Sequence, residues 1–363
     1  MKPGKEGYRV AVVGASSLLG KELVTVLEEE KFPISRLVTF DTDEDEPEIP
    51  IIDLREASKI SVEDRDVSEA ELDFAFLAAR PRELPAFLRS WQEHRGAAHC
   101  LVIDLVGEGL GAGASGAAGD HPGGVASAAH EVQVPFLDRR FPAGAPESAG
   151  AAIHVSAHPA VIVISALLLR LAARFPLQTA VAQVFGSASE SGSRGIEELQ
   201  KQTVNLLSFQ KIPRQIFGAQ LAFNLLSRLG RAATGEMASL EARLRRQLHA
   251  YLGERVPRPA LRLFQVPVFY SLGVSLYVKT AEPVAPEAAA VALAGERVRV
   301  RRSAQDAPTQ VEVTGSSDIL VDSMSSDAEH PTGLWLWAVA DDLRLAATNA
   351  VELAASLRER ARA

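Results

Sequence analysis

A glycine-bounded loop near the start of the chain is the first segment whose residue types suggest a ligand. Gly14-Ala15-Ser16-Ser17-Leu18-Leu19-Gly20 follows an apolar segment and precedes one with helical periodicity. Glycines in such a loop let backbone N–H groups approach a pyrophosphate at a helix N-terminus. Ser17 stands where a dinucleotide loop has its middle glycine, and its side chain is expected to crowd or redirect the phosphates. The loop therefore predicts either a dinucleotide site, formed by Gly14, Ser16, Ser17, Leu18, Leu19 and Gly20, or a strand-to-helix turn that binds no nucleotide.

An acidic residue further along the chain bears on which dinucleotide would bind. Asp41 lies 21 residues after Gly20, at the end of the second predicted strand. A carboxylate there can accept hydrogen bonds from the ribose hydroxyls of NAD, whereas NADP needs a cation for its 2′-phosphate. The acidic segment DTDEDEPE, which begins at Asp41, contains no cation. The sequence favours NAD over NADP if an NAD(P) cofactor binds, and the alternative is a solvated acidic turn with no cofactor.

His158 and Pro159 precede a strongly apolar segment, AVIVISALLL, that is predicted to form a buried helix. Proline suits the first helical turn because its missing N–H costs nothing there, so His158 is predicted near the N-cap. Three roles stay open for His158: capping or packing, binding an anion together with the helix dipole, and acid/base work in a thiol-free hydride transfer. His154, four residues earlier in a predicted strand, is interpreted as structural.

The remaining reactive residues do not form a known catalytic or metal-binding pattern. Cys100 is the only cysteine, which excludes an internal disulfide, and it is interpreted as a small buried apolar side chain. No HExxH motif or Cys/His cluster occurs, so no metal site is predicted. No GxSxG elbow supports serine catalysis. Weaker candidates are Ser189, Glu190 and Ser191 in one loop and the cations Arg194, Lys211 and Arg214, which fit an ordinary surface.

Composition narrows the classes of partner. The 363 residues are enough for two domains, and the net charge of −8 with no Lys/Arg cluster argues against nucleic acid as a partner. The longest apolar run, Ala160–Leu169, is far shorter than the roughly 20 residues that span a bilayer, so no membrane partner is expected. The chain's opening has no signal-peptide pattern, and a single cysteine fits a reducing compartment. A cytoplasmic location is therefore expected.

The order of predicted elements indicates how these residues are positioned. Apolar segments at 8–13, 35–40, 72–79 and 99–106 alternate with helical segments, which is typical of βαβ units and a parallel sheet. Residues 107–129 are Gly/Ala-rich and predict a loop. The later elements arrive in groups, which favours an α+β domain. They are helices at Pro159–Arg174, Gly195–Ser208 and Ala238–Gly253, strands at Gln178–Phe185, Ala260–Phe269 and Gly273–Val278, and a last amphipathic helix, LRLAATNAVELAASLRER.

Several segments together resemble one family, the aspartate-semialdehyde dehydrogenases. They occur in the family's order and are YRVAVVGASSLLGKELVTVLEEEKFPISRL, LVID, SASESGSRGIEELQKQT, QLAFNLL, VPVFY, PTQVEV and GLWLWAVADDLRLAATNAVELA. The resemblance implies an α/β fold with a Rossmann-like, parallel-sheet NAD(P)-binding domain, residues 1–150 plus 340–363, completed by the C-terminal helix. It implies a central α+β catalytic-type and dimerisation domain, residues 151–339. A homodimer, and a place in amino-acid biosynthesis, are implied with it.

The residues that carry the family's chemistry are missing from this chain. The family uses a cysteine nucleophile, an acid/base histidine and arginines that hold phosphate and substrate. The nucleophile position falls on His158, within two residues of slip, and the approximate acid/base position is Leu272. The arginine expected before VPV is Gln265, and the phosphate-binding segment reads Asp104-Leu105-Val106-Gly107. Near the C-terminus, Asp341-Asp342-Leu343-Arg344 stands one residue too close to Asn349.

These departures leave three interpretations of function. Loss of a covalent nucleophile costs on the order of 10⁶ in kcat, so the first is a non-catalytic paralogue that acts by binding a protein or a retained ligand. SASESG and the lost cysteine resemble the Usg-type paralogues of the family most. The second is an NAD(P)-dependent oxidoreductase with altered, thiol-free chemistry. The third is an enzyme that still acts on aspartate semialdehyde by another route.

Overall fold

The computed structural model describes residues 7–40, 72–79, 88, 100–107, 131–142, 153–301, 306–322 and 324–360. The chain divides into two compact units, residues 1–157 with 346–363, and residues 158–345. Both boundaries lie a few residues after the expected ones at 150/151 and 339/340. The reason is that a strand at His154–Ser156 belongs to the first sheet, whereas the first residues of the last helix belong with the second unit.

The first unit is built on a six-stranded sheet in which every described pair is parallel. The strand order is β2-β1-β3-β4-β6-β5. All four residues of β3 are buried, as is typical of a parallel strand covered on both faces. The elements are β1 (Tyr8–Val13), α1 (Leu18–Glu29), β2 (Ile34–Phe40), β3 (Phe74–Leu77), β4 (Leu101–Asp104), β5 (Glu131–Gln133), α3 (Pro135–Asp138) and β6 (His154–Ser156).

The last helix of the chain, α8 (Asp342–Arg360), completes the core of this first unit. Its residues Val351, Leu353 and Leu357 are buried in one apolar cluster with Tyr8 and Phe74 of the sheet. The predicted completion of the Rossmann-like domain by the C-terminal helix is therefore confirmed. The helical segment expected between 79 and 99 and the loop predicted at 107–129 fall almost entirely outside the described residues.

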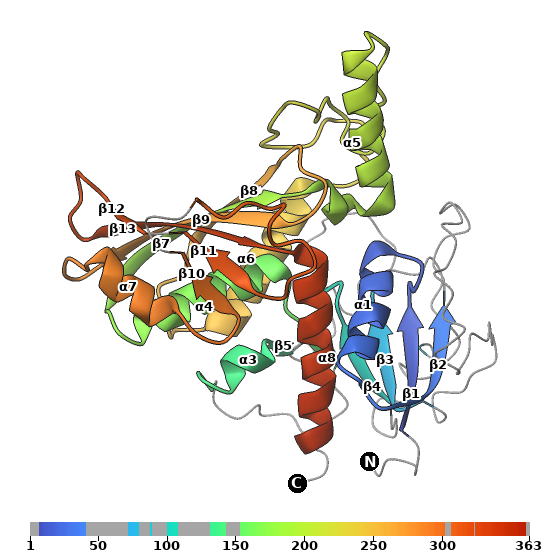
Figure 1. The fold of residues 1–363 in the computed structure, drawn as a ribbon, viewed down its shortest axis with the longest axis horizontal. Coiled ribbons are helices and arrows are strands. Elements are labelled where there is room, and N and C mark those ends of the chain that lie inside the picture. Colours follow the sequence, from blue (N-terminus) through green and yellow to red (C-terminus); the bar gives the residue numbers. More distant parts are fainter. Residues whose placement is uncertain are drawn as a thin grey trace, which may run out of the picture. The chain divides into compact units, whose positions relative to one another are not determined.

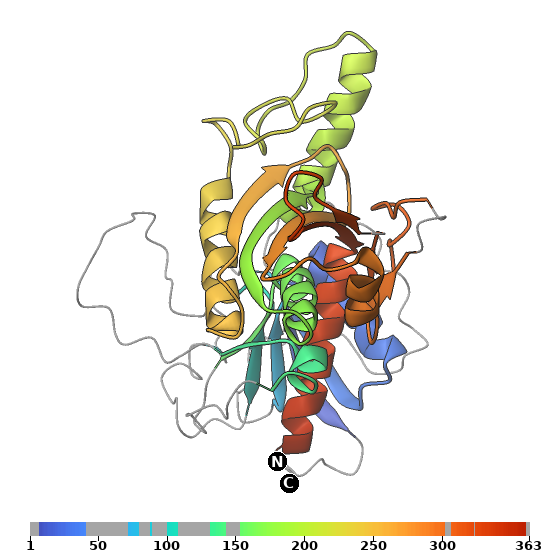
Figure 2. The ribbon, with the colours of Figure 1, turned by 90° about the vertical axis from the view of Figure 1, so that its left-hand side faces the viewer.

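The second unit is a mixed sheet with three helices on one face. Its strand order is β10-β11-β13-β9-β7-β8, and β12 pairs with β13. Helix α4 contacts β7, β9 and β13, with α6 and α7 on either side of it (Figure 2). The elements are α4 (Pro159–Ala172), β7 (Leu177–Gly186), η3 (Ala188–Ser191), α5 (Gly192–Leu207), α6 (Met237–Leu252), β8 (Ala260–Gln265), β9 (Leu272–Thr280), α7 (Pro286–Leu293), β10 (Val298–Val300), β11 (Ile319–Val321), β12 (Ser325–Ser326) and β13 (Gly333–Ala340).

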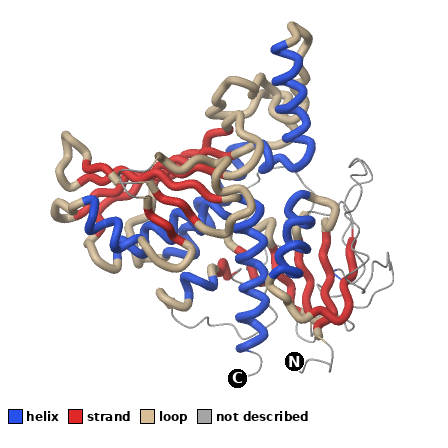
Figure 3. The backbone as a smooth tube through the Cα atoms, viewed as in Figure 1, coloured by secondary structure: helices blue, strands red, loops and turns tan. Residues whose placement is uncertain are grey.

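Some boundaries in this unit differ from the predicted ones. Strand β8 ends at Gln265 rather than Phe269, since Pro267 cannot donate to a ladder. Helix α5 begins at Gly192, three residues before the predicted Gly195. The strands β10 to β13 and helix α7 were not predicted, and the strands are visible in Figure 3. Within segment 308–313, which resembles the family, residues 310–313 lie in turns.

Helix α5 holds a long loop, residues 208–226, through two buried side chains (Figure 1). The Glu198 carboxylate accepts the N–H groups of Gln215, Ile216 and Phe217 at 2.7–3.1 Å. Gln202 accepts the N–H groups of Leu221 and Ala222 and donates to the carbonyls of Pro213 and Ala219. Since these bonds satisfy the loop backbone, the loop has a defined shape although it lacks regular structure.

Candidate functional site

The glycine loop of the first unit can be formed only by glycine at its two ends. Gly14 has φ +81°, and a Cβ atom on it would lie 2.4 Å from the Cβ of Ala79. A Cβ atom on Gly20 would lie 2.0 Å from the carbonyl oxygen of Gly14. The start of α1 therefore packs directly on the end of β1, as a dinucleotide-binding βα turn requires.

Ser17 is the N-cap of α1. Its Oγ donates to the Gly14 carbonyl at 2.7 Å and accepts the Gly20 N–H at 3.0 Å, so the side chain caps α1. Both bonds draw the hydroxyl back into the turn, and the expectation that Ser17 crowds or redirects the phosphates stays a prediction. The N–H groups of Leu18 and Leu19, in the first turn of α1, have no carbonyl one turn earlier within the helix.

The loop therefore fits the pyrophosphate of a dinucleotide. A pyrophosphate needs a backbone that it can approach closely, and first-turn N–H groups at a helix N-terminus. The loop and the capped start of α1 provide both. Strand β2 ends at Phe40, whose carbonyl accepts the Gly14 N–H at 2.6 Å. Asp41, the residue expected to contact the ribose, follows directly and lies outside the described residues.

His158 is the N-cap of α4, as predicted. Its Nδ1 accepts the backbone N–H of Ala160 at 3.1 Å, so the ring proton of the neutral form is on Nε2. Nε2 lies 3.1 Å and 3.3 Å from the two carboxylate oxygens of Glu190, to which it donates. The backbone N–H of His158 donates to Oε1 of Gln247, in α6, at 2.9 Å. Both ring nitrogens are therefore engaged in hydrogen bonds within the second unit.

Glu190 is the acceptor at the centre of this cluster. Arg243 of α6 lies 3.7 Å from its Oε1. Burial alone would raise the pKa of Glu190, but the charge and hydrogen bond of the His158 ring, followed by the charge of Arg243, lower it to about 2. Glu190 is therefore an anion at neutral pH, and it is paired on both sides. The sequence offered no signal for Arg243 or Gln247, because one Arg and one Gln on an amphipathic helix are ordinary surface residues.

A second, buried polar cluster lies next to Glu190 in the chain. Ser189 Oγ donates to Oδ2 of Asp342 at 2.5 Å, and the N–H of Ser271 donates to Oδ1 at 2.8 Å. Ser187 Oγ lies 2.7 Å from Ser189 Oγ and 3.5 Å from Asp342 Oδ2. Burial raises the pKa of Asp342 to about 6, against the lowering effect of the Ser189 hydrogen bond. Ser189 is buried, so its hydroxyl serves this cluster rather than an open site.

The other positions that matter for the family's chemistry have structural roles. Leu272, at the approximate acid/base position, begins β9 and is buried. The side chain of Gln265, where an arginine was expected, donates to the carbonyl of Gly186 at 3.0 Å. The Asp104 carboxylate accepts the N–H groups of Val106 and Gly107 at 2.8–2.9 Å and so shapes its own turn.

The remaining candidates are Cys100, His154 and the three cations of the second unit. Cys100 is buried just before β4, in the first unit, as predicted. His154 lies in β6, and burial, followed by the charge of Arg360, lowers its pKa to about 4. Arg194, Lys211 and Arg214 are exposed. Within the described ranges, no group of three or more His, Cys, Asp or Glu side chains could hold a metal ion. None of the helices described there is long and apolar enough to cross a membrane.

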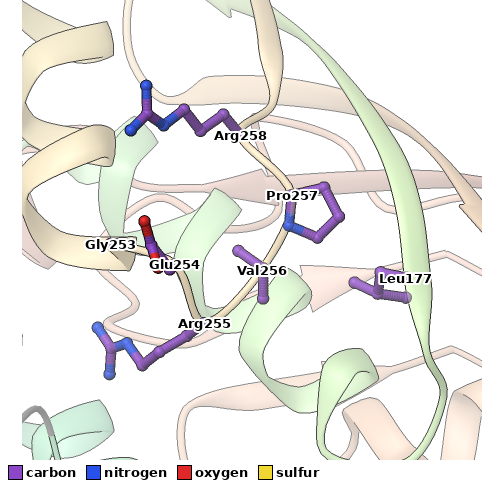
Figure 4. Close-up of a pocket in the computed structure, with 7 residues that line it drawn as sticks. All are labelled: Leu177, Gly253, Glu254, Arg255, Val256, Pro257 and Arg258. Atoms are coloured by element: carbon purple, nitrogen blue, oxygen red, sulfur yellow. The ribbon is translucent and has the colours of Figure 1, made fainter.

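The second unit has a surface hollow after α6. It is lined by Leu177 and the turn Gly253–Arg258, after α6 (Figure 4). Neither the glycine loop nor the His158 cluster contributes to it.

Comparison with known proteins agrees with this two-unit architecture. Residues 9–108 match the family model of the semialdehyde dehydrogenase NAD binding domain, and residues 168–345 match that of the semialdehyde dehydrogenase dimerisation domain. A "USG-1 protein homolog" of Pseudomonas aeruginosa is 30% identical over 352 residues, which cover 95% of this chain and 96% of the relative. The chain therefore belongs to the semialdehyde dehydrogenase family, and its first unit is of the NAD(P)-binding Rossmann type.

Relatives named as enzymes are also similar over the whole chain. "Aspartate-semialdehyde dehydrogenase 2" of Vibrio cholerae is 26% identical, covering 96% of both chains. The solved structure of a probable aspartate-semialdehyde dehydrogenase from Pseudomonas aeruginosa has a TM-score of 0.77 and 27% identity, covering 97% of this chain and 98% of its own. Aspartate semialdehyde dehydrogenase II from Vibrio cholerae, solved with ASA, has the same fold with a TM-score of 0.75, at 21% identity and covering 98% and 99% of the two chains.

Proposed function

We propose that this protein is a non-catalytic member of the aspartate-semialdehyde dehydrogenase-like family that acts by binding. The observation that carries the proposal is the state of His158, at the family's nucleophile position. Its Nδ1 accepts the N–H of Ala160 and its Nε2 donates to Glu190. A nucleophile needs a free electron pair, and a general base needs a free nitrogen. His158 offers neither while it caps α4.

The other side chains near this position support the same proposal. The Ser189 hydroxyl donates a hydrogen bond to the Asp342 carboxylate. Leu272, at the approximate acid/base position, cannot transfer a proton. Loss of a covalent nucleophile costs on the order of 10⁶ in kcat, and here the acid/base residue and the anion-binding arginines are lost as well. What acts instead is binding, either of a retained ligand or of another protein.

The test is the phosphate-dependent oxidation of aspartate semialdehyde, with NAD and with NADP. We expect no turnover above buffer, and we expect the variant His158→Cys to be equally inactive because Leu272 still replaces the acid/base residue. The aspartate-semialdehyde dehydrogenase 2 of Vibrio cholerae is the matched positive control. Turnover by the unmodified protein would overturn the proposal and favour the route that uses another nucleophile.

A dinucleotide is the retained ligand that the first unit supports best, and NAD is proposed rather than NADP. The glycine loop fits a pyrophosphate, and the acidic segment after β2, starting at Asp41, offers no cation for a 2′-phosphate. When bound, a nicotinamide dinucleotide supplies a hydride acceptor or donor. The same loop supports the alternative function, an NAD(P)-dependent oxidoreductase of the semialdehyde dehydrogenase class with thiol-free chemistry.

Thermal unfolding with NAD, NADH, NADP and NADPH, each at 1 mM, separates these cases. A site with a Kd near 10 μM adds about 2.7 kcal/mol at that concentration, which raises the Tm by a few degrees. We expect a shift with NAD and NADH only, and its loss in Asp41→Ala. An equal shift with NADP would contradict the role given to Asp41. No shift with any of the four would contradict dinucleotide binding.

We propose that the protein forms a homodimer in the cytoplasm. The match of residues 168–345 to the semialdehyde dehydrogenase dimerisation domain supports the homodimer. The sheet face opposite α4 carries half-exposed apolar side chains, among them Val181 and Trp335, and no described helix covers that face (Figure 1). The loop after α5 adds Phe209, 99% exposed, and Phe223, 68% exposed. Light scattering should give twice the monomer mass at micromolar concentration, and a monomer there would contradict the proposal.

A further inference from the structure

Two helices of the second unit bring two donor side chains to one point. His158 stands at the start of α4, and Arg243 lies on α6, which packs against α4 (Figure 2). The backbone N–H of His158 donates to Oε1 of Gln247, also on α6, at 2.9 Å. Gln247 follows Arg243 by four positions, so both side chains lie on the same face of α6. The bond from His158 to α6 therefore keeps the His158 ring and Arg243 close together.

The His158 ring is oriented by the backbone of its own helix. Its Nδ1 accepts the N–H of Ala160 at 3.1 Å, which leaves Nε2 as the donor of the neutral ring. Gln247 and Ala160 thus fix the histidine without help from the group that Nε2 contacts. Donors that are held in this way are preorganised for an acceptor.

The acceptor between these donors is a carboxylate from a third element, η3. Nε2 of His158 lies 3.1 Å from Oε1 and 3.3 Å from Oε2 of Glu190, and Arg243 lies 3.7 Å from Oε1. Burial alone would raise the pKa of Glu190, and the carboxylates of Glu190 and Asp342 repel each other. His158 and then Arg243 outweigh burial and lower the pKa of Glu190 to about 2. The position therefore attracts a carboxylate anion.

We infer that His158 and Arg243 form a carboxylate site that the chain fills with its own Glu190, so that external carboxylates are kept out. The inference rests on the proposed loss of catalysis at the His158 position and deepens it, because it names the class of anion that this position excludes. A side chain fixed in η3 is present at an effective concentration of about millimolar or more, so a dilute free carboxylate does not displace it. The three side chains keep exposed fractions of 12–23%, so a small ion can reach the site once the Glu190 carboxylate is removed.

Replacing Glu190 by alanine and supplying acetate tests the site. Glu190→Ala removes a methylene and a carboxylate, and acetate has the matching size and charge. With a Kd of about 10 mM, sodium acetate at about 100 mM favours the folded form about tenfold over sodium chloride at the same concentration, which raises the Tm by a few degrees. We expect this rise in Glu190→Ala and none in the unmodified protein, whose site is filled. No rise in Glu190→Ala, or an equal rise in the unmodified protein, would overturn the inference.

Three controls assign the acetate response to this site. Glu197→Ala is the matched variant, because Glu197 pairs with Lys201 at 3.2 Å on an exposed part of α5, and its loss should give no response. Acetamide, which has the shape of acetate but no charge, should not stabilise Glu190→Ala. Adding Arg243→Met to Glu190→Ala should abolish most of the response. A response that survives without Arg243, or that is equal in Glu197→Ala, would place the acetate elsewhere and overturn the inference.

Backbone amide NMR shows where the acetate binds. In Glu190→Ala, acetate should shift the amide signals of His158 and Ala160, which adjoin the site, and unshifted signals there would contradict the assignment. If Glu190→Ala does not fold, Glu190→Ser takes its place, since its short side chain also leaves the carboxylate position open. The inference and the proposed function can fail separately. Turnover of aspartate semialdehyde by the unmodified protein would overturn the proposed function, whereas the acetate response reports only whether Glu190 fills the site.

Discussion

The glycine loop of the first unit still fits what a dehydrogenase of this family needs, whereas the His158 cluster of the second unit lacks the reactive side chains. The loop depends on backbone: two glycines, a capped helix and first-turn N–H groups. The His158 cluster depends on side chains, and there a histidine, a glutamate and an arginine are hydrogen-bonded or paired with one another. Backbone geometry is protected by the fold that it builds, whereas a reactive side chain can be replaced without disturbing the helix that carries it.

The largest effect is expected for the variant Gly20→Ala. The new Cβ would lie 2.0 Å from the Gly14 carbonyl oxygen, and backbone atoms cannot move aside cheaply. We expect a loss of about 3 kcal/mol or more in the stability of the first unit and loss of any NAD-dependent shift in Tm. Guanidinium denaturation followed by circular dichroism measures the stability.

Gly235→Ala is the matched control, since a Cβ there meets nothing within 4 Å. Its stability should be equal or up to about 1 kcal/mol higher. A Gly20→Ala variant as stable as Gly235→Ala would show that the loop tolerates side chains and was not kept for its close approach.

The next largest effect concerns Asp342. Because its pKa in the folded protein is raised from 3.8 to about 6, the folded state binds more protons than the unfolded state between these values. Stability contributed by the protonated carboxyl is therefore lost as the pH rises from about 4 to about 6. Asp342→Asn should remove that slope and stabilise the second unit at pH 7.5 by about 2 kcal/mol. Denaturation midpoints from pH 4 to pH 8 measure it.

Asp341→Asn, one residue earlier, should have the opposite sign. Asp341 accepts two backbone N–H groups, and an amide offers one acceptor fewer. Destabilisation by Asp342→Asn at pH 7.5 would mean that its hydrogen bonds outweigh the cost of burying the charge.

His158→Asn tests how the second region is held. Asparagine keeps the cap of α4 but loses the contact to Glu190. Glu190 has its pKa lowered from 4.5 to about 2, so its contribution is present above pH 4.5 and lost as the pH falls towards 2. We expect the free energy of unfolding to fall by about 1 kcal/mol at pH 7, and to decrease less steeply between pH 5 and pH 2 than in the unmodified protein. An equally steep decrease in stability would mean that a group other than Glu190 titrates in this range. Glu190→Gln should show the same weaker pH dependence as His158→Asn.

The smallest effect expected is that of Ser17. Ser17→Ala should cost about 1 kcal/mol through the lost cap, and Ser17→Gly only a few tenths. Since the hydroxyl is turned into the helix, Ser17→Gly should leave the Kd for NAD within about threefold by calorimetry. Tenfold tighter binding would show that Ser17 obstructs the phosphates after all.

Local patterns predicted the fold of the first unit well. The alternation of short apolar strands with helical segments predicted β1 and β2 to within one residue, and β3 and β4 with two residues too many at each end, because parallel strands buried on both faces are short apolar runs. The strands β10 to β13 were missed since most have only two or three residues, and the eight-residue β13 is apolar nearly throughout. Such segments are fixed by pairing with distant strands rather than by their own sequence.

The site was predictable where it depends on chain order and not where it depends on tertiary contacts. Pro159 predicted the N-cap role of His158, because proline marks the first turn of a helix. The partners of His158 are distant in sequence: Glu190 lies 32 positions later and Gln247 lies 89 positions later. Arg243, which pairs with Glu190, also comes from another helix, α6. No spacing rule relates such residues, and the cap that Ser17 forms on α1 likewise became visible only in the structure.

The position of α8 has a consequence for synthesis. Residues 8–13 and 74–77 are translated before the second unit, whereas Val351, Leu353 and Leu357 of α8, which pack against them, are translated after it. The second unit, residues 158–345, is translated between these two parts of the first unit. The core of the first unit therefore cannot close before residues 346–360 have been translated, and until then its apolar sheet face is open to aggregation or to chaperones.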